Sequence, residues 1–309
     1  MDQYLLFAVI VAAAFAAGIM NSVAGGGTLL TFPALITFLA AAGYGEKTEA
    51  VANASSTLAL LPGSLAGAWA YRAEYRPARA FALQLLPPSV AGGIIGSVLV
   101  ALYPKAFGPL VPWLILTAAV LFLLQHPINK VLKRRRERAA AAGMVGGDRA
   151  VIDLRPLRAV RRRQVALLIA FQFLVAVYGG YFGAGIGILM LTALGFMGLA
   201  DIHQANAVKT LLASVINGVS VVVFVVGGLI DWPAAAVMSA AAVCGGYVGA
   251  RVARRLPGAY VRWVVVAIGF TLAGYYLWKQ FAPAPPPAVT RSTAAEPAAP
   301  APAPPSTAP

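Results

Sequence analysis

The sequence predicts an all-α, polytopic integral membrane protein built from two homologous halves. Two observations lead to this fold class. The chain of 309 residues is 60% hydrophobic and only 11% charged, with a mean hydropathy of +0.78, whereas a soluble domain of this length needs more charge to cover its surface. The chain also repeats itself, because Ala52-Asn53-Ala54 returns 153 positions later as Ala205-Asn206-Ala207.

The repeat extends well beyond these two short stretches. Glycine-rich stretches precede the copies, at 25–27 and 183–187, and further glycines follow them, at 92–96 and 245–249. A duplicated membrane chain whose halves carry glycine-interrupted, polar-spotted segments is typical of secondary transporters. In the later pair of stretches glycines recur at a spacing of four residues, which predicts close packing between helices.

Ten apolar segments are candidates for membrane crossings, and the sequence predicts eight to ten crossings, with ten favoured. A bilayer core of ~30 Å needs ~20 helical residues, so segments 28–43 and 186–200 are short, and each follows a glycine-rich stretch. We expect these two to be half-helices with an unwound start, which is tolerated only beside a cavity within the protein. The ten segments are approximately 4–20, 28–43, 48–71, 80–102, 108–125, 164–180, 186–200, 204–228, 233–254 and 259–279.

Basic residues are distributed unevenly between the loops. If all ten segments cross, arginines gather in the loops on one side, at 72–79, 126–163 and 251–262, and the opposite loops carry few basic residues. The positive-inside bias then makes the arginine-rich side cytoplasmic and places both termini outside, in the periplasm. Five crossings per half also give an inverted repeat. If the two short segments are re-entrant, eight crossings remain and the two halves share one orientation.

The chain divides into four parts: an N-terminal transmembrane repeat (1–125), a basic connector (126–163), a C-terminal transmembrane repeat (164–280) and a tail (281–309). The connector has twelve Lys or Arg residues and three acidic residues, and we expect a flexible cytoplasmic loop that contacts anionic membrane lipids. It lacks the aromatic residues that nucleic-acid sites interleave with basic ones, so no nucleic-acid partner is expected. The tail consists almost entirely of Pro, Ala, Ser and Thr, which predicts disorder.

Lys209 is the one cation that lies within an apolar segment rather than at its edge. It falls about two turns into the helix that we expect to start near Gln204, and a buried ammonium group is costly unless it is paired. No acidic residue lies within two turns on the membrane side of it. One interpretation is that its side chain extends toward Asp201 or a lipid head group. The other is that its missing partner is an anionic substrate.

Small polar residues surround Lys209, and others occupy the equivalent stretch of the first half, near Asn53. Such residues commonly join transmembrane helices, but their recurrence beside the glycine stretches of both halves favours a binding role. Exposed N–H groups of a glycine stretch at the start of a half-helix can bind an anion, toward which the positive end of the helix dipole points. The residues expected to bind the substrate are Asn21, Ser22, Gly25, Gly26, Gly27, Thr28, Asn53, Ser56, Thr57, Gly183, Gly185, Gly187, Asn206, Lys209, Thr210 and Asn217.

The sequence lacks the motifs of other classes of site. The glycine stretches have neither the preceding strand of a dinucleotide fingerprint nor, at 25–28, the lysine of a P-loop. The single cysteine, Cys244, excludes a disulfide within the chain. The sequence contains no His/Cys/carboxylate cluster and no serine–base pair, so we expect neither an enzyme nor a bound metal or cofactor. Asp231, before Trp232-Pro233, is expected to cap the following helix.

Two longer motifs contain the glycine stretches and the repeated asparagines. The first runs from Asn21 to Leu35 (NSVAGGGTLLTFPAL) and is followed by Ala52-Asn53-Ala54. The second runs from Tyr178 to Gly187 (YGGYFGAGIG) and continues in His203 to Lys209. Together they resemble the two signatures of the TauE/SafE sulfite exporter family, over about residues 5–280. The resemblance implies a bacterial inner-membrane permease for sulfite, organosulfonates or related small anions, often working outward. The long arginine-rich connector departs from the usual pattern.

We therefore expect a secondary transporter and, by the resemblance, a sulfite exporter that binds a small anionic substrate between its halves and exposes it to each side in turn. No carboxylate lies deep in a segment, so a coupled proton has only His203 as a weak candidate, and uniport is equally compatible. The alternatives are an anion channel-like pore and a non-transporting membrane scaffold that docks a partner through its basic connector. The sequence indicates no oligomeric state.

Overall fold

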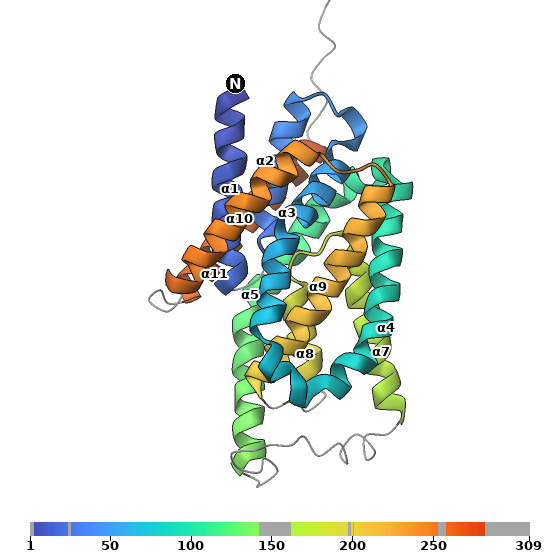
Figure 1. The fold of residues 1–309 in the computed structure, drawn as a ribbon, viewed down its shortest axis with the longest axis vertical. Helices are drawn as coiled ribbons and strands as arrows, with labels where there is room; N and C mark the ends of the chain where they lie inside the picture. Colours follow the sequence, from blue (N-terminus) through green and yellow to red (C-terminus); the bar gives the residue numbers. More distant parts are fainter. Residues whose placement is uncertain are drawn as a thin grey trace, which may run out of the picture.

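The computed structural model describes residues 3–23, 26–141, 162–196, 199, 201–252 and 258–281. These residues form helices and turns and contain no β-strand, as the sequence predicts (Figure 1). The first half consists of α1 (Gln3–Val23), α2 (Thr28–Ala41), a short 3₁₀ helix (Gly45–Lys47), α3 (Thr48–Ala70), α4 (Arg72–Leu102) and α5 (Pro104–Ala141). The second half consists of α7 (Arg162–Tyr181), α8 (Ile186–Phe196), α9 (Ile202–Val226), α10 (Trp232–Val252) and α11 (Gly258–Phe281).

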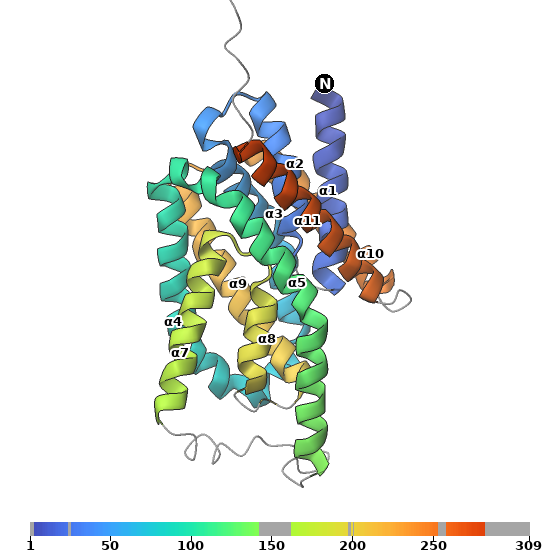
Figure 2. The ribbon, with the colours of Figure 1, turned by 180° about the vertical axis from the view of Figure 1, so that it is seen from behind.

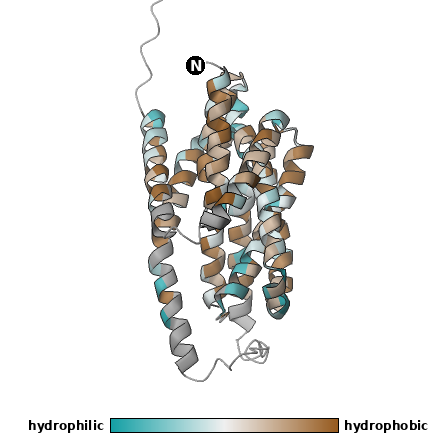
Figure 3. Ribbon diagram, turned by 60° about the vertical axis from the view of Figure 1, so that its left-hand side comes forward, coloured by the Kyte–Doolittle hydropathy of each residue, from teal (hydrophilic) through white to brown (hydrophobic). Residues whose placement is uncertain are grey.

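The apolar helices differ in length. Among the described helices, four contain stretches that are long and apolar enough to cross a membrane: Tyr4–Asn21 in α1, Arg72–Leu102 in α4, Pro104–Leu124 in α5 and His203–Val226 in α9. Shorter apolar stretches lie in α2, α7, α8 and α10. Figure 3 shows hydrophobic residues along the middle of the helices, while hydrophilic residues gather mostly toward their ends. This distribution is that of a polytopic membrane protein.

The two short helices predicted from the sequence are α2 and α8. They have 14 and 11 residues, which at ~1.5 Å per residue falls well short of a ~30 Å bilayer core. Figures 1 and 2 show α2 toward the end of the molecule that carries the N-terminus, and α8 toward the opposite end. Neither helix therefore runs the full length of the bundle.

α4 and α5 are longer than the sequence predicts. α4 begins at Arg72 rather than near residue 80, and α5 continues to Ala141, so residues 126–141 of the expected flexible connector are helical. Lys, Arg, Glu and Ala fill this part of α5 and are good helix formers in water, so the helix does not end where its apolar segment ends. Residues 142–161 and the tail from residue 282 lie outside the described residues, and the predictions for them stay predictions.

Two helix pairs join the halves at close range. α1 packs along α10, and α4 packs along α7. A Cβ added at Gly245 would fall 2.0 Å from the carbonyl oxygen of Phe15, and one at Gly96 would fall 2.1 Å from that of Val177. These backbones approach so closely that there is no room for a side chain. The prediction of close packing is therefore confirmed at Gly96 and Gly245, and also at Gly92.

The first helices of the two halves, α1 and α7, run in opposite directions. α1 runs away from the end of the molecule marked by the N-terminus, whereas α7 starts near the opposite end and runs back (Figures 1 and 2). The start of α1 and the end of α11 lie toward one end of the molecule, and the end of α5 and the start of α7 lie toward the other. These directions and the matched helix pairs favour the inverted repeat, which stays a prediction.

Asp231 connects the turn before α10 to the first half. Its Oδ1 accepts a hydrogen bond from the N–H of Ala234 at 2.9 Å, so it caps α10 as the sequence predicts. Its Oδ2 accepts a hydrogen bond from the Tyr44 hydroxyl at 2.7 Å, and its own N–H donates to the Ser55 hydroxyl at 2.9 Å. The pKa of Tyr44 is raised, first by this hydrogen bond to Asp231 and then by burial and by the carboxylate's charge.

Replacing Tyr44 by Phe should lower stability modestly. Tyr44 is 39% exposed, so we expect a loss of about 1 kcal/mol or less. Because the pKa of Tyr44 is raised, the contribution is fully present below the ordinary tyrosine value of ~10 and is lost as pH rises through the raised value. Thermal unfolding of both proteins should give a constant difference from neutral pH to pH ~9 that shrinks at higher pH. A difference that does not change with pH would contradict this account.

Candidate functional site

Two glycine turns interrupt the helices, as the sequence predicts. Between α1 and α2, Gly26 has φ +100°, and between α7 and α8, Gly183 and Gly185 have φ +81° and +82°. Residues with a Cβ rarely adopt these angles, so glycine allows the chain to leave one helix and begin the next. A Cβ added at Gly26 would fall 2.1 Å from Cζ of Phe122, and one at Gly185 would fall 3.3 Å from Cδ1 of Leu121. The turns of both halves therefore meet neighbouring residues of α5.

Asn53 connects α3 of the first half to the second glycine turn. Its side chain is only 1% exposed. The amide Nδ2 donates a hydrogen bond at 3.0 Å to the carbonyl oxygen of Tyr181, which is the last residue of α7. The Oδ1 atom of Asn53 is buried and accepts no hydrogen bond from the described residues. Asn53 therefore fixes the end of α7 and keeps one acceptor without a donor.

The hydroxyl groups near Asn53 are bonded within the protein. The hydroxyls of Ser56 on α3 and Thr31 on α2 share a hydrogen bond, and Thr31 also donates to the carbonyl oxygen of Gly27 at 3.3 Å. The Thr57 hydroxyl donates to the Asn53 carbonyl oxygen at 2.8 Å. The bond between Ser56 and Thr31 joins α3 to α2, which is the common role of Ser and Thr in membranes, whereas Thr57 bonds within α3.

Lys209 of α9 lies against the start of α8. A Cβ added at Gly187, in the first turn of α8, would fall 3.3 Å from Cδ and 3.8 Å from Cε of Lys209, so the aliphatic stem of the lysine runs over this glycine. Asn217, about two turns further along α9, approaches the same turn, because a Cβ at Gly183 would fall 4.0 Å from its Oδ1. One charged and one amide side chain of α9 thus lie beside the second glycine turn.

No acidic side chain neutralises Lys209 in the described part of the chain. The ion pair recorded there joins Lys105 and Glu46. Asp201 instead caps α9, where it accepts a hydrogen bond from the N–H of His203 at 2.8 Å. A lysine at the centre of a membrane helix costs roughly 2.5–3.5 kcal/mol on insertion scales, and Lys209, in the first third of α9, bears part of this cost. A bound anion would offset this cost, because an opposite charge stabilises the buried ammonium.

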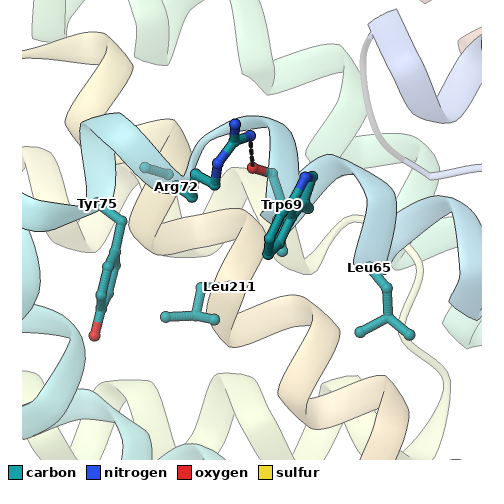
Figure 4. Close-up of a pocket in the computed structure, with 7 residues that line it drawn as sticks. Leu65, Trp69, Arg72, Tyr75 and Leu211 are labelled. Atoms are coloured by element: carbon teal, nitrogen blue, oxygen red, sulfur yellow. Dashed lines mark hydrogen bonds between the residues drawn. The ribbon is translucent and has the colours of Figure 1, made fainter.

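A cavity of about 280 Å³ lies where α3, α4 and α9 meet (Figure 4). The guanidinium of Arg72 lies 4.7 Å from the centre of the Trp69 ring and donates to the Trp69 carbonyl oxygen at 3.1 Å. Ala207 and Leu211 stand two residues before and after Lys209, so they face the opposite side of α9. The residues that line the cavity are Leu65, Ala68, Trp69, Arg72, Tyr75, Ala207 and Leu211. It contains none of the predicted site residues.

Comparison with known proteins identifies the family. A family model described as Sulfite exporter TauE/SafE matches residues 10–276. The chain belongs to the TauE/SafE sulfite exporter family. A protein of Haemophilus influenzae (strain ATCC 51907 / DSM 11121 / KW20 / Rd), described as "Probable membrane transporter protein", is 24% identical over 284 residues, which cover 89% of this chain and 96% of that protein. No solved structure gives a significant match. The protein is thus a multi-pass membrane transporter of the TauE/SafE family.

The structure of this TauE/SafE transporter brings part of the predicted site together. Gly183, Gly185, Gly187, Lys209 and Asn217 form one group at the second glycine turn. Asn53 is joined to the group through its hydrogen bond to the end of α7. The group therefore combines residues of both halves.

Other predicted residues have no recorded contact with this group among the described residues. Thr210 contacts α3, since a Cβ added at Gly67 would fall 3.3 Å from its Cγ2. In the described part of the chain, no contact with the group is recorded for Asn21, Thr28 or Asn206. The side chain of Ser22 and all of Gly25 lie outside the described residues.

Three residues at the turns were missed in the sequence. Thr31 follows Gly27 by one helical turn, a spacing that the sequence displays. The hydroxyl of Tyr178 donates to the carbonyl oxygen of Ala184 at 2.8 Å and so stabilises the second glycine turn. Tyr181 takes part through its backbone carbonyl, which no sequence motif marks.

Proposed function

We propose that this TauE/SafE transporter moves small sulfur-containing anions, such as sulfite or organosulfonates, out of the cell across the bacterial inner membrane. The observation that carries the proposal is the position of Lys209. Its stem lies on Gly187 in the first turn of α8, and no acidic partner is recorded for it among the described residues. The family description suggests the substrate class. A lysine without such a partner explains why the substrate would be negatively charged.

The substrate lies between Lys209 and the start of α8. The N–H groups of the first turn of a helix have no partner within the helix, and the dipole adds a partial positive charge there. Together with the lysine ammonium, these groups favour an anion. Asn217, beside Gly183, contributes an amide N–H to a substrate oxygen, since an asparagine side chain has two donors. Asn53 holds the end of α7 in place.

Transport proceeds by alternating access at the interface between two inverted halves. The opposite directions of α1 and α7, and the matched pairs α1 with α10 and α7 with α4, support this proposal. Transporters of this kind bind their substrates near the midplane, at interrupted helices. The arginine-rich connector is cytoplasmic and both termini are periplasmic, which agrees with the end of α5 and the start of α7 lying toward one end of the molecule and the start of α1 and the end of α11 toward the other.

Flux measurements with a panel of anions test this function. Cells with and without the protein are loaded with sulfite, thiosulfate, sulfoacetate or taurine, and efflux is followed for each compound. We expect faster efflux of at least one sulfur anion. In proteoliposomes, saturation of the initial rate with concentration would separate a carrier from a channel-like pore. Absence of flux for every anion in both directions would favour the non-transporting scaffold instead.

A further inference from the structure

The side-chain amide of Asn53 has a fixed orientation. Its Nδ2 donates to the Tyr181 carbonyl oxygen at 3.0 Å, and a flipped amide would place two acceptor oxygens against each other. Oδ1 is therefore the atom that lacks a partner among the described residues. Leaving a buried acceptor unpaired costs free energy, so this oxygen needs a hydrogen-bond donor or a cation.

Nearby donors on the same elements are already used. The hydroxyl of Thr57 donates to the backbone of Asn53 itself, and the hydroxyl of Tyr178 donates to the Ala184 carbonyl oxygen. The N–H groups of Phe182 and Gly183 both donate to the Tyr178 carbonyl oxygen, at 2.9 Å and 3.2 Å. The side chain of Asn53 thus meets a helix end that offers carbonyl oxygens, and these four donors are not available to it.

The end of α7 favours a positive charge. The carbonyl groups of the last turn point out of a helix at its C-terminus and carry the negative end of its dipole. In the described residues no backbone hydrogen bond is recorded to the carbonyl oxygens of Gly179 and Gly180, which belong to this last turn. Carbonyl and amide oxygens can replace the hydration shell of a monovalent cation.

We propose that Asn53 Oδ1 and the carbonyl oxygens at the end of α7 bind a monovalent alkali cation, with Na⁺ as the ion to be tested. The ligands are neutral oxygens, whereas protein sites for Ca²⁺ and Mg²⁺ use carboxylates. No group of three His, Cys, Asp or Glu side chains that could hold a metal ion occurs in the described part of the chain. A carried proton would need a titratable acceptor, and neither an amide nor a backbone carbonyl supplies one.

The cation would lie at one side of the second glycine turn and the anion at the other. The end of α7 presents carbonyl oxygens, and the start of α8 presents N–H groups and Lys209. Opposite charges on the two sides of one turn favour each other's binding, which would couple the two sites. The coupling rests on the proposed anion site, but binding of the cation does not.

Thermal unfolding of the purified full chain in detergent, without any sulfur anion, tests the cation site. Equal concentrations of NaCl and choline chloride are compared, so that ionic strength and chloride are matched. A ligand that binds only the folded protein raises the unfolding midpoint, and we expect NaCl to raise it by several degrees. Equal midpoints in the two salts would overturn the proposal. A water molecule would then be the hydrogen-bond donor to Asn53 Oδ1.

Two variants and a control locate the effect. Asn53→Leu keeps the branched shape of the side chain without the oxygen and should lose the Na⁺ shift. Gln172→Leu removes another buried amide, which donates to the Ser89 hydroxyl at 2.9 Å between α7 and α4, and should keep the shift. If Asn53→Leu does not fold, Asn53→Asp carries the test, because a carboxylate should lower the half-saturating Na⁺ concentration at least threefold. A shift that is unchanged in the Asn53 variant tested would overturn the assignment, whatever the anion measurements give.

Discussion

Replacing Lys209 by Ala should reduce anion efflux at least tenfold while the amount of folded protein in the membrane stays normal. The variant removes the cation beside Gly187, and a substrate anion entering the site would lose its opposite charge. Loss of one charge-assisted contact costs ~1.5–3 kcal/mol, and ~1.4 kcal/mol corresponds to a factor of ten. Folding should not suffer, because removal of a lysine from an apolar helix also removes its insertion cost.

Lys105→Ala is the matched control for this experiment. Lys105 is an exposed lysine of the first half, paired with Glu46 at the surface, and an exposed ion pair contributes ~1 kcal/mol or less. Efflux by this variant should equal that of the wild type. Protein abundance is measured by immunoblotting of the membrane fraction. Wild-type flux through Lys209→Ala at normal abundance would remove this lysine from the site.

Gly96→Ala should disrupt the packing of α4 on α7. A Cβ at this position falls 2.1 Å from the Val177 carbonyl oxygen and 2.7 Å from the Tyr181 nitrogen. Ordinary van der Waals contact begins at 3.4 Å, so the two helices must separate. Overpacking of this degree costs about 3 kcal/mol. We expect a large loss of monodisperse protein extracted in mild detergent and a lower unfolding midpoint.

Gly274→Ala is the control for the added methyl group. Gly274 lies within α11, and a Cβ there would have no neighbour within 4 Å. Ala is a better helix former than Gly by ~0.5–1 kcal/mol, so this variant should be as stable as the wild type or slightly more stable. Equal behaviour of Gly96→Ala and Gly274→Ala would show that α4 and α7 are not packed as described.

Much of the fold follows from the sequence because membrane helices obey two simple limits. Apolar segments mark the helices, and a segment too short for the bilayer core marks a half-helix. Gly26 and Gly27 accordingly precede α2, and Gly183 and Gly185 precede α8. The four-residue spacing also predicts the contact that Gly96 makes with α7, since only a residue without a side chain permits such an approach.

Hydropathy does not predict where a helix ends in water. α4 begins several residues before its apolar segment, and α5 passes Pro127 to end at Ala141. The apolar pattern reports which residues prefer lipid, whereas helix formation by Lys, Arg, Glu and Ala needs no lipid. The expectation that the connector starts as a flexible loop was wrong for this reason.

The candidate site was predictable in part. Lys209 stands out because a cation in an apolar helix is costly, and the structure places its stem on Gly187, another predicted residue. The bond from Asn53 to the Tyr181 carbonyl oxygen joins residues 128 positions apart, so only the tertiary structure reveals it. Thr210 is another predicted site residue, but its Cγ2 lies toward Gly67 of α3.

An experimental structure with selenite most directly tests the central claim that Lys209 binds the anion. Selenite has the shape and charge of sulfite, and the anomalous signal of selenium identifies it without ambiguity. We predict a selenium peak beside α8, with a selenite oxygen within about 3.2 Å of Lys209 Nζ. A selenium peak elsewhere, or a carboxylate bonded to Lys209 Nζ at saturating selenite, would contradict the account.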